Sequence, residues 1–174
     1  MARAWIGLGS NLGDSRQTLL AAWRQLGGLK EIKAVRLSSL YQSKPVDMDS
    51  DNWFVNAVGE LTTSLSPEKL LGQLLTIEHT FGRRRDPALA GHQDRTLDLD
   101  LLLYDDLVLK TARLELPHPR LHKRLFVLAP LAELAPDLVH PVRLRRMEEL
   151  HRHLLNTTRN DRSQTIRKLP EGPR

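Results

Sequence analysis

Residues 96–110 read TLDLDLLLYDDLVLK, in which leucine first alternates with aspartate and the chain then turns at Asp105-Asp106. Alternate residues of a β-strand lie on the same face, so the leucines predict a buried face and Asp98 and Asp100 point together to the opposite one. The rise of a strand places the two aspartate backbones about 7 Å apart. The segment therefore predicts one or two strands and a pair of carboxylates on one side of the first.

Apolar spacing upstream of this segment predicts two helices and three further strands. The first helix ends at Gly27-Gly28, and the second extends from its N-cap Ser66 to Gly82. We expect the strands at 3–8, 32–41 and 54–65. The last two could pair as a hairpin with a long loop, and Met147, Leu150 and Leu154 indicate a C-terminal helix.

The predicted order of elements is β, α, β, β, α, β. This order favours an α+β fold in which helices pack on one mostly antiparallel sheet, as in ferredoxin-like βαββαβ sandwiches. A chain of 174 residues suits a single domain, and no linker interrupts it. We place this domain at residues 1–158 and expect the basic tail, residues 159–174, to be flexible, because it has few large apolar residues.

The composition describes an ordinary soluble protein, with 40% hydrophobic and 27% charged residues. The first apolar run, residues 4–8, is too short for a signal sequence or a membrane span, so we expect a cytoplasmic protein. Without cysteine, a disulfide, a thiolate zinc site and a cysteine nucleophile are all excluded. The formal charge of +5 favours an anionic partner.

Arginines directly precede the aspartate pair. Carboxylate oxygens suit magnesium, which fills its remaining positions with phosphate and water, and guanidinium groups bind phosphate oxygens. The arrangement thus favours phosphoryl chemistry, with a half-exposed strand and a solvated or nucleic-acid-binding basic patch as the alternatives. The arginines are Arg83, Arg84, Arg85 and Arg95.

Four more residues are candidates for a site. Glu78 lies one turn before the arginines and could buttress Arg83 or Arg85, or be a simple helix-end carboxylate. Phe54 and Asn56 share a strand face and suit a flat heterocycle, although Phe54 alone would more often be a core residue. His118, between two prolines and near Arg124 and Phe126, could reach a ligand or be structural.

Two common nucleotide-binding motifs are absent from the sequence. The stretch GLGSNLG at 7–13 is one residue too long for the dinucleotide-binding fingerprint. No G-x-x-x-x-G-K-[ST] sequence occurs, which excludes a P-loop enzyme.

Five segments together resemble one family, the 6-hydroxymethyl-7,8-dihydropterin pyrophosphokinases, in order from about Ala4 to Pro141. They are GSNLG at 9–13, FVNA at 54–57, GRRR at 82–85, RTLDLDLLLY at 95–104 and LPHPRLHKRLF at 116–126. The resemblance implies a monomeric enzyme of folate biosynthesis that transfers a pyrophosphoryl group from ATP to the pterin hydroxymethyl oxygen and releases AMP.

The resemblance also implies a role for each candidate residue. Asp98 and Asp100 would hold two magnesium ions, and Phe54 and Phe126 would sandwich the pterin while Asn56 binds its edge. Lys44, Pro45 and Val46 would line the pterin pocket. The residues expected at ATP are Glu78, Arg83, Arg85, Arg95, His118 and Arg124. The catalytic residues would be Arg83, Arg85, Arg95, Asp98 and Asp100.

The chain departs from this family where W-G-P-R is common, since it reads His92-Gln93-Asp94-Arg95. Two alternatives to the pyrophosphokinase are a ferredoxin-like RNA-binding module without catalysis and a small-molecule kinase that releases ADP. The first lacks the aromatic-rich strand motif of RNA-binding modules, and its aspartate face would repel phosphate unless metal intervened.

Overall fold

A computed structural model of the chain describes residues 1–46, 50–83, 94–159 and 164–170. Its main sheet has the strand order β5-β1-β4-β3-β8, and β2 also pairs with β4. All of these pairings are antiparallel. The strands are β1 (Ala2–Ser10), β2 (Ile32–Leu37), β3 (Tyr41–Ser43), β4 (Phe54–Thr63), β5 (Asp98–Tyr104) and β8 (Ile166–Lys168). The predicted α+β fold with a βαββαβ core is confirmed.

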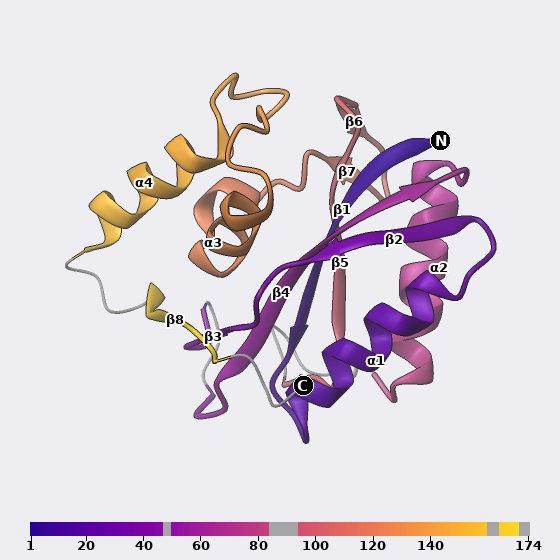
Figure 1. The fold of residues 1–174 in the computed structure, drawn as a ribbon, viewed down its shortest axis with the longest axis horizontal. Coiled ribbons are helices and arrows are strands. Elements are labelled where there is room, and N and C mark those ends of the chain that lie inside the picture. The colour runs from indigo at the N-terminus through magenta and orange to yellow at the C-terminus, as the bar shows by residue number, and fades with distance from the viewer. Residues whose placement is uncertain (47–49, 84–93, 160–163, 171–174) are drawn as a thin grey trace.

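Helices α1 (Ser15–Gly27) and α2 (Pro67–Thr80) cover one face of this sheet (Figure 1). Each begins at a side-chain cap, since Asp14 accepts from the Gln17 amide and Ser66 from the Lys69 amide. Their apolar faces pack on β1, β4 and β5 in one buried cluster that includes Leu19, Leu26, Leu70, Leu74 and Ile77. Burial of these side chains is the main stabilisation of this layer.

A second helical layer covers the opposite face of the sheet (Figure 1). It consists of the short 3₁₀ turn η1 (Leu121–Lys123), α3 (Leu125–Leu134) and α4 (Met147–Thr158). Trp5, Leu102, Leu128 and Met147 are buried between this layer and the sheet. We predicted α4 but not α3, whose sequence LFVLAPLAEL has no polar stripe and contains Pro130, so helical periodicity was hidden.

The alternation in β5 has the predicted effect. Leu97, Leu99 and Leu101 are buried under α1 and α2, while Asp98 and Asp100 lie on the other face. A bulge beside Trp5 then shifts the register, and Leu102 and Leu103 are both buried in the second cluster. The carboxylates therefore lie where the second helical layer begins to cover the sheet.

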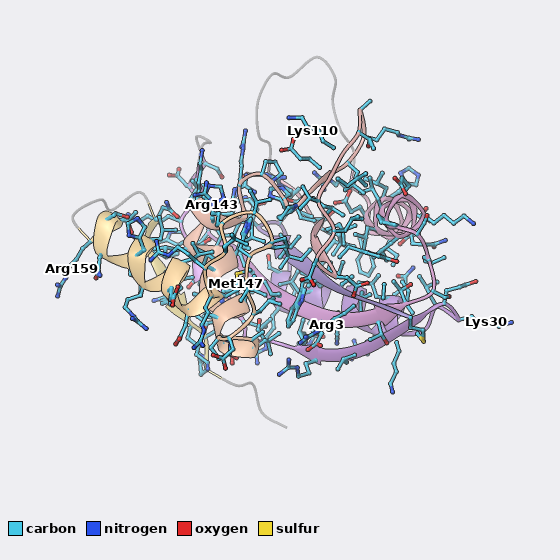
Figure 2. The ribbon with its side chains drawn as sticks, turned by 90° about the horizontal axis from the view of Figure 1, so that it is seen from above. Arg3, Lys30, Lys110, Arg143, Met147 and Arg159 are labelled. Carbon is cyan, nitrogen blue, oxygen red and sulfur yellow. The ribbon has the colours of Figure 1, made fainter. Side chains whose placement is uncertain are left out.

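Beyond the turn at Asp105, strands β6 (Leu109–Lys110) and β7 (Glu115–Leu116) form a separate hairpin. Figure 2 shows Lys110 at this hairpin and Arg159 at the end of α4. The sequence predicts one or two strands from the segment around this turn, and the structure has two, β5 and β6. No described helix is both long and apolar enough to cross a membrane.

Part of the basic tail, which we expect to be flexible, has regular secondary structure. Residues 166–168 form β8, which pairs antiparallel with β3. The pairing uses backbone groups along the edge of a three-residue strand, and amino-acid composition carries no signal for such groups. The flexibility of residues 159–174 stays a prediction.

We predict that Gly59→Ala destabilises the fold. A Cβ at Gly59 on β4 would lie 2.2 Å from a ring carbon of Trp23, which packs over this strand from α1. Overpacking of this kind costs about 1–3 kcal/mol of unfolding free energy, which urea denaturation measures. Gly72→Ala is the control, because nothing lies within 4 Å of a Cβ there, and it should raise stability by up to about 1 kcal/mol. Equal effects of both variants would contradict the packing argument.

Candidate functional site

Glycines of β1 form the floor of the candidate site. Gly9 pairs with Asn56 on one side and with Asp98 on the other, and Gly7 pairs with Asp100. A Cβ at Gly9 would lie 3.3 Å from the Asn56 Oδ1 atom. Because β1 has no side chain at these positions, the sheet face stays open between the amide on β4 and the carboxylates on β5.

A cavity of about 330 Å³ lies over this floor. That volume is within the range of small-molecule sites. Among the residues proposed from the sequence, Pro45 is not part of the cavity wall, although both of its neighbours are, and Arg85 lies outside the described residues. The others all line the cavity: Lys44, Val46, Phe54, Asn56, Glu78, Arg83, Arg95, Asp98, Asp100, His118, Arg124 and Phe126.

Ion pairs connect the end of α2 with the start of β5. Arg83 Nη1 contacts both Glu78 Oε1 and Asp98 Oδ1, and the contact with Glu78 is one of the alternatives that the sequence left open. Glu78 is only 3% exposed, and it also accepts a hydrogen bond from the Leu99 amide at 2.7 Å. Arg95 Nη1 donates to Asp98 Oδ2 at 3.0 Å. Both oxygens of Asp98 are thus held by arginines.

Asp100 and His118 have altered acidity. Burial and the charge of Asp98 raise the pKa of Asp100 to about 6, although Arg124, whose Nη1 is 3.9 Å from Asp100 Oδ2, acts in the opposite direction. Burial, with Arg124 and Arg120 nearby, lowers the pKa of His118 to about 4. His118 Nδ1 accepts from the Arg120 amide at 3.2 Å. A neutral ring in this arrangement carries its proton on Nε2.

The apolar part of the cavity has aromatic rings with cations beside them. The Arg95 guanidinium lies 5.6 Å from the centre of the Phe54 ring, and that of Arg124 lies 5.4 Å from the Phe126 ring. Asn56 is 4% exposed, and its Nδ2 donates to Ser43 Oγ at 2.9 Å. This bond fixes the amide and orients its oxygen toward Gly9.

A network of polar side chains fixes the backbone at Arg95. The backbone N of Asn11 donates to Arg95 O at 3.1 Å, and the side-chain Oδ1 of Asn11 accepts from Arg95 N at 2.8 Å. Asp94 accepts from the side-chain amides of Asn11 and Asn52, each at 2.6 Å. Hydrogen bonds, led by that of Ser50, lower the pKa of Asp94.

Several residues of the site were missed in the sequence. The glycines at 7 and 9 have a usable signal, because they alternate with Leu8 as Asp98 and Asp100 do with Leu99. Asp94 and Asn52 had no such signal, since their contact joins residues 42 positions apart. Arg120 and Pro119 also line the cavity.

The sequence matches the family model described as 7,8-dihydro-6-hydroxymethylpterin-pyrophosphokinase over residues 5–136. The chain belongs to this family. The resemblance noted in the sequence is therefore confirmed.

Relatives and solved structures agree with the family match. A 2-amino-4-hydroxy-6-hydroxymethyldihydropteridine pyrophosphokinase of Haemophilus influenzae is 44% identical over 81% of this chain and 86% of its own length. One from Methylorubrum extorquens is 40% identical over 80% and 86%. A Plasmodium falciparum HPPK-DHPS, solved with pterin and p-hydroxybenzoate, has the same fold with a TM-score of 0.73 at 15% identity. The match covers 91% of this chain and 44% of that longer one.

We predict that Asp94→Asn lowers stability in a pH-dependent way. A hydrogen bond from an amide to a charged carboxylate stabilises the fold more than one to a neutral acceptor. The substitution should therefore lower the free energy of unfolding by about 1–2 kcal/mol at pH 7. Because the folded-state pKa is lowered, this stabilisation is present above the unfolded pKa of about 3.9 and disappears as the pH falls through the folded value. Urea denaturation between pH 7 and pH 2.5 measures the difference. The exposed Asp106→Asn is the control, and a difference that does not vary with pH would contradict the argument.

Proposed function

We propose that this pyrophosphokinase transfers a pyrophosphoryl group from ATP to the hydroxymethyl oxygen of 6-hydroxymethyl-7,8-dihydropterin and releases AMP. One observation carries the proposal. The arginine-bound Asp98 and the partly exposed Asp100 face the same cavity as Phe54, Phe126 and Asn56. A phosphate-binding end and a ring-binding end within one small cavity are what transfer between a nucleotide and a flat heterocycle requires.

The basic residues would bind and neutralise the phosphates. Arg95 Nε is buried and has no hydrogen-bond partner among the described residues, so this donor is left for a ligand. Neutral His118 would donate from Nε2 without adding charge. Arg83 and Arg124 already lie beside the carboxylates, and we keep Arg85 in this set as a proposal from the sequence alone.

The carboxylates suit magnesium. Asp98 and Asp100 offer only oxygen ligands, and the raised pKa of Asp100 indicates a carboxylate that a nearby cation would stabilise. The described residues contain no cluster of three or more metal-ligating side chains, so phosphate and water would supply the remaining ligands. Two magnesium ions, when bound, would neutralise phosphate charge and polarise the attacking hydroxyl.

The pterin would lie between Phe54 and Phe126, with Asn56 at its edge. Stacking provides contact area, while the amide, fixed by Ser43, provides hydrogen bonds that select the ring. Lys44 and Val46 would close the side of the pocket. We further propose a monomeric, cytoplasmic protein that binds no nucleic acid, with the activity in residues 1–158.

The decisive experiment incubates the protein with ATP, magnesium and 6-hydroxymethyl-7,8-dihydropterin and separates the nucleotides by chromatography. AMP that forms only with the pterin present supports the proposal. ADP would instead identify an ordinary kinase. If neither nucleotide forms with any metal, the binding-module alternative is to be tested by RNA titration.

We predict that Asp98→Ala and Asp100→Ala each lower kcat about 100-fold or more. Each removes a carboxylate that faces the phosphate-binding end, and losses of this size follow when transition-state charge is left unbalanced. Magnesium titrations of the rate, with circular dichroism to check the fold, measure the effect. Asp106→Ala, in the exposed turn after β5, is the matched control and should keep the rate. Near-normal turnover of both site variants would refute the metal assignment.

A further inference from the structure

Residues 164–169 contact two parts of the cavity wall, although they lie outside the family match and do not line the cavity. Gln164 uses both ends of its side-chain amide on the chain around Arg124. Its Oε1 accepts from the Leu125 amide at 2.9 Å, and its Nε2 donates to Lys123 O at 3.0 Å. The two bonds straddle Arg124, which lines the cavity together with Phe126.

The first of these bonds supplies an acceptor for a backbone amide at the start of α3. The N-cap residue Arg124 makes no side-chain cap hydrogen bond, so the first amides of α3 need acceptors from elsewhere. Gln164 supplies one of them from 39 residues away. Phe126, in the first turn of α3, directly follows the residue whose amide is held in this way.

The next residue, Thr165, contacts the part of the wall formed by Lys44. Lys44 N donates to Thr165 O at 3.1 Å, and β8 continues along β3 until Leu169 N donates to Leu40 O at 2.8 Å. A second link joins the same elements, since Lys168 Nζ lies 3.2 Å from Glu133 Oε2 on α3, and Glu133 also accepts from Tyr41 OH on β3. Thus β8 connects α3 with the end of β3 from which Lys44 and Val46 extend.

We propose that Gln164 is a positioning residue that sets the separation between Phe126 and the Lys44 segment, and so the width of the pterin pocket. The inference rests on the proposed function and extends the functional unit beyond residue 158. Since Phe126 and Lys44 would contact the ring and not the reacting atoms, their displacement removes binding that ground state and transition state share.

The test compares the full-length protein with Gln164→Ala. The KM for the pterin at saturating ATP and magnesium should rise about five- to tenfold, the effect of losing hydrogen bonds of ordinary strength, while kcat stays within about twofold. Gln164→Glu keeps an acceptor for the Leu125 amide and places negative charge at the start of α3. Its KM should therefore lie between that of the wild type and that of Gln164→Ala. Gln17→Ala, an exposed glutamine on α1, is the control and should keep both constants.

Hydrogen exchange provides a readout that does not depend on turnover. In Gln164→Ala the amides of Leu125 and Lys44 should exchange about tenfold faster, while the Leu128 amide, bonded to Arg124 O within α3, should not change. Faster exchange with an unchanged KM would overturn the proposal, because Gln164 would then only cap α3. Unchanged exchange would also overturn it. If the wild type forms no AMP, the proposed function fails, and exchange at Lys44 still decides whether Gln164 couples the two segments.

Discussion

The Arg83 guanidinium is shared by two carboxylates, Glu78 on α2 and Asp98 on β5, and the geometry of the cavity depends on this contact. Glu78 is almost completely buried, and an unpaired charge there would cost several kcal/mol. The arginine and the Leu99 amide together satisfy it. The helix end is thereby fixed to the strand that carries both aspartates.

The charges around the cavity explain why cations would accompany a nucleotide. Burial keeps His118 neutral, so the net charge of the cavity wall comes from the lysine, the arginines and the carboxylates. Among the residues that the structure describes, the wall carries five basic side chains, Lys44, Arg83, Arg95, Arg120 and Arg124, and three acidic ones, Glu78, Asp98 and Asp100. The basic groups outnumber the acidic ones, which leaves a modest positive excess for a triphosphate. Divalent cations at the two aspartates would convert the acidic part of the wall from repulsion to attraction.

The sequence predicted those features that depend on local periodicity or on a familiar motif. Alternation in β5 predicted the shared face of Asp98 and Asp100, and the cap at Ser66 predicted the start of α2. What it missed depends on contacts between distant residues or on an absent polar face. Helix α3 is apolar on all sides because it is buried, so its sequence has no amphipathic period. Strand β8 is fixed by the edge of β3, which only the fold creates.

Side-chain amides hold the site at two places where this chain does not rely on backbone stiffness. At Asp94, where the family commonly has proline, a carboxylate and two asparagines fix the approach to Arg95 by hydrogen bonds. At Gln164, the side-chain amide bonds the chain at the start of α3, and the carbonyl of the next residue, Thr165, accepts from the Lys44 amide. Proline would restrict the chain through its φ angle, whereas hydrogen bonds restrict it only while their partners keep the right charge and geometry. The position of Arg95 should therefore respond to pH, through Asp94, and to substitutions of Asn11 and Asn52, which lie far from it in the sequence.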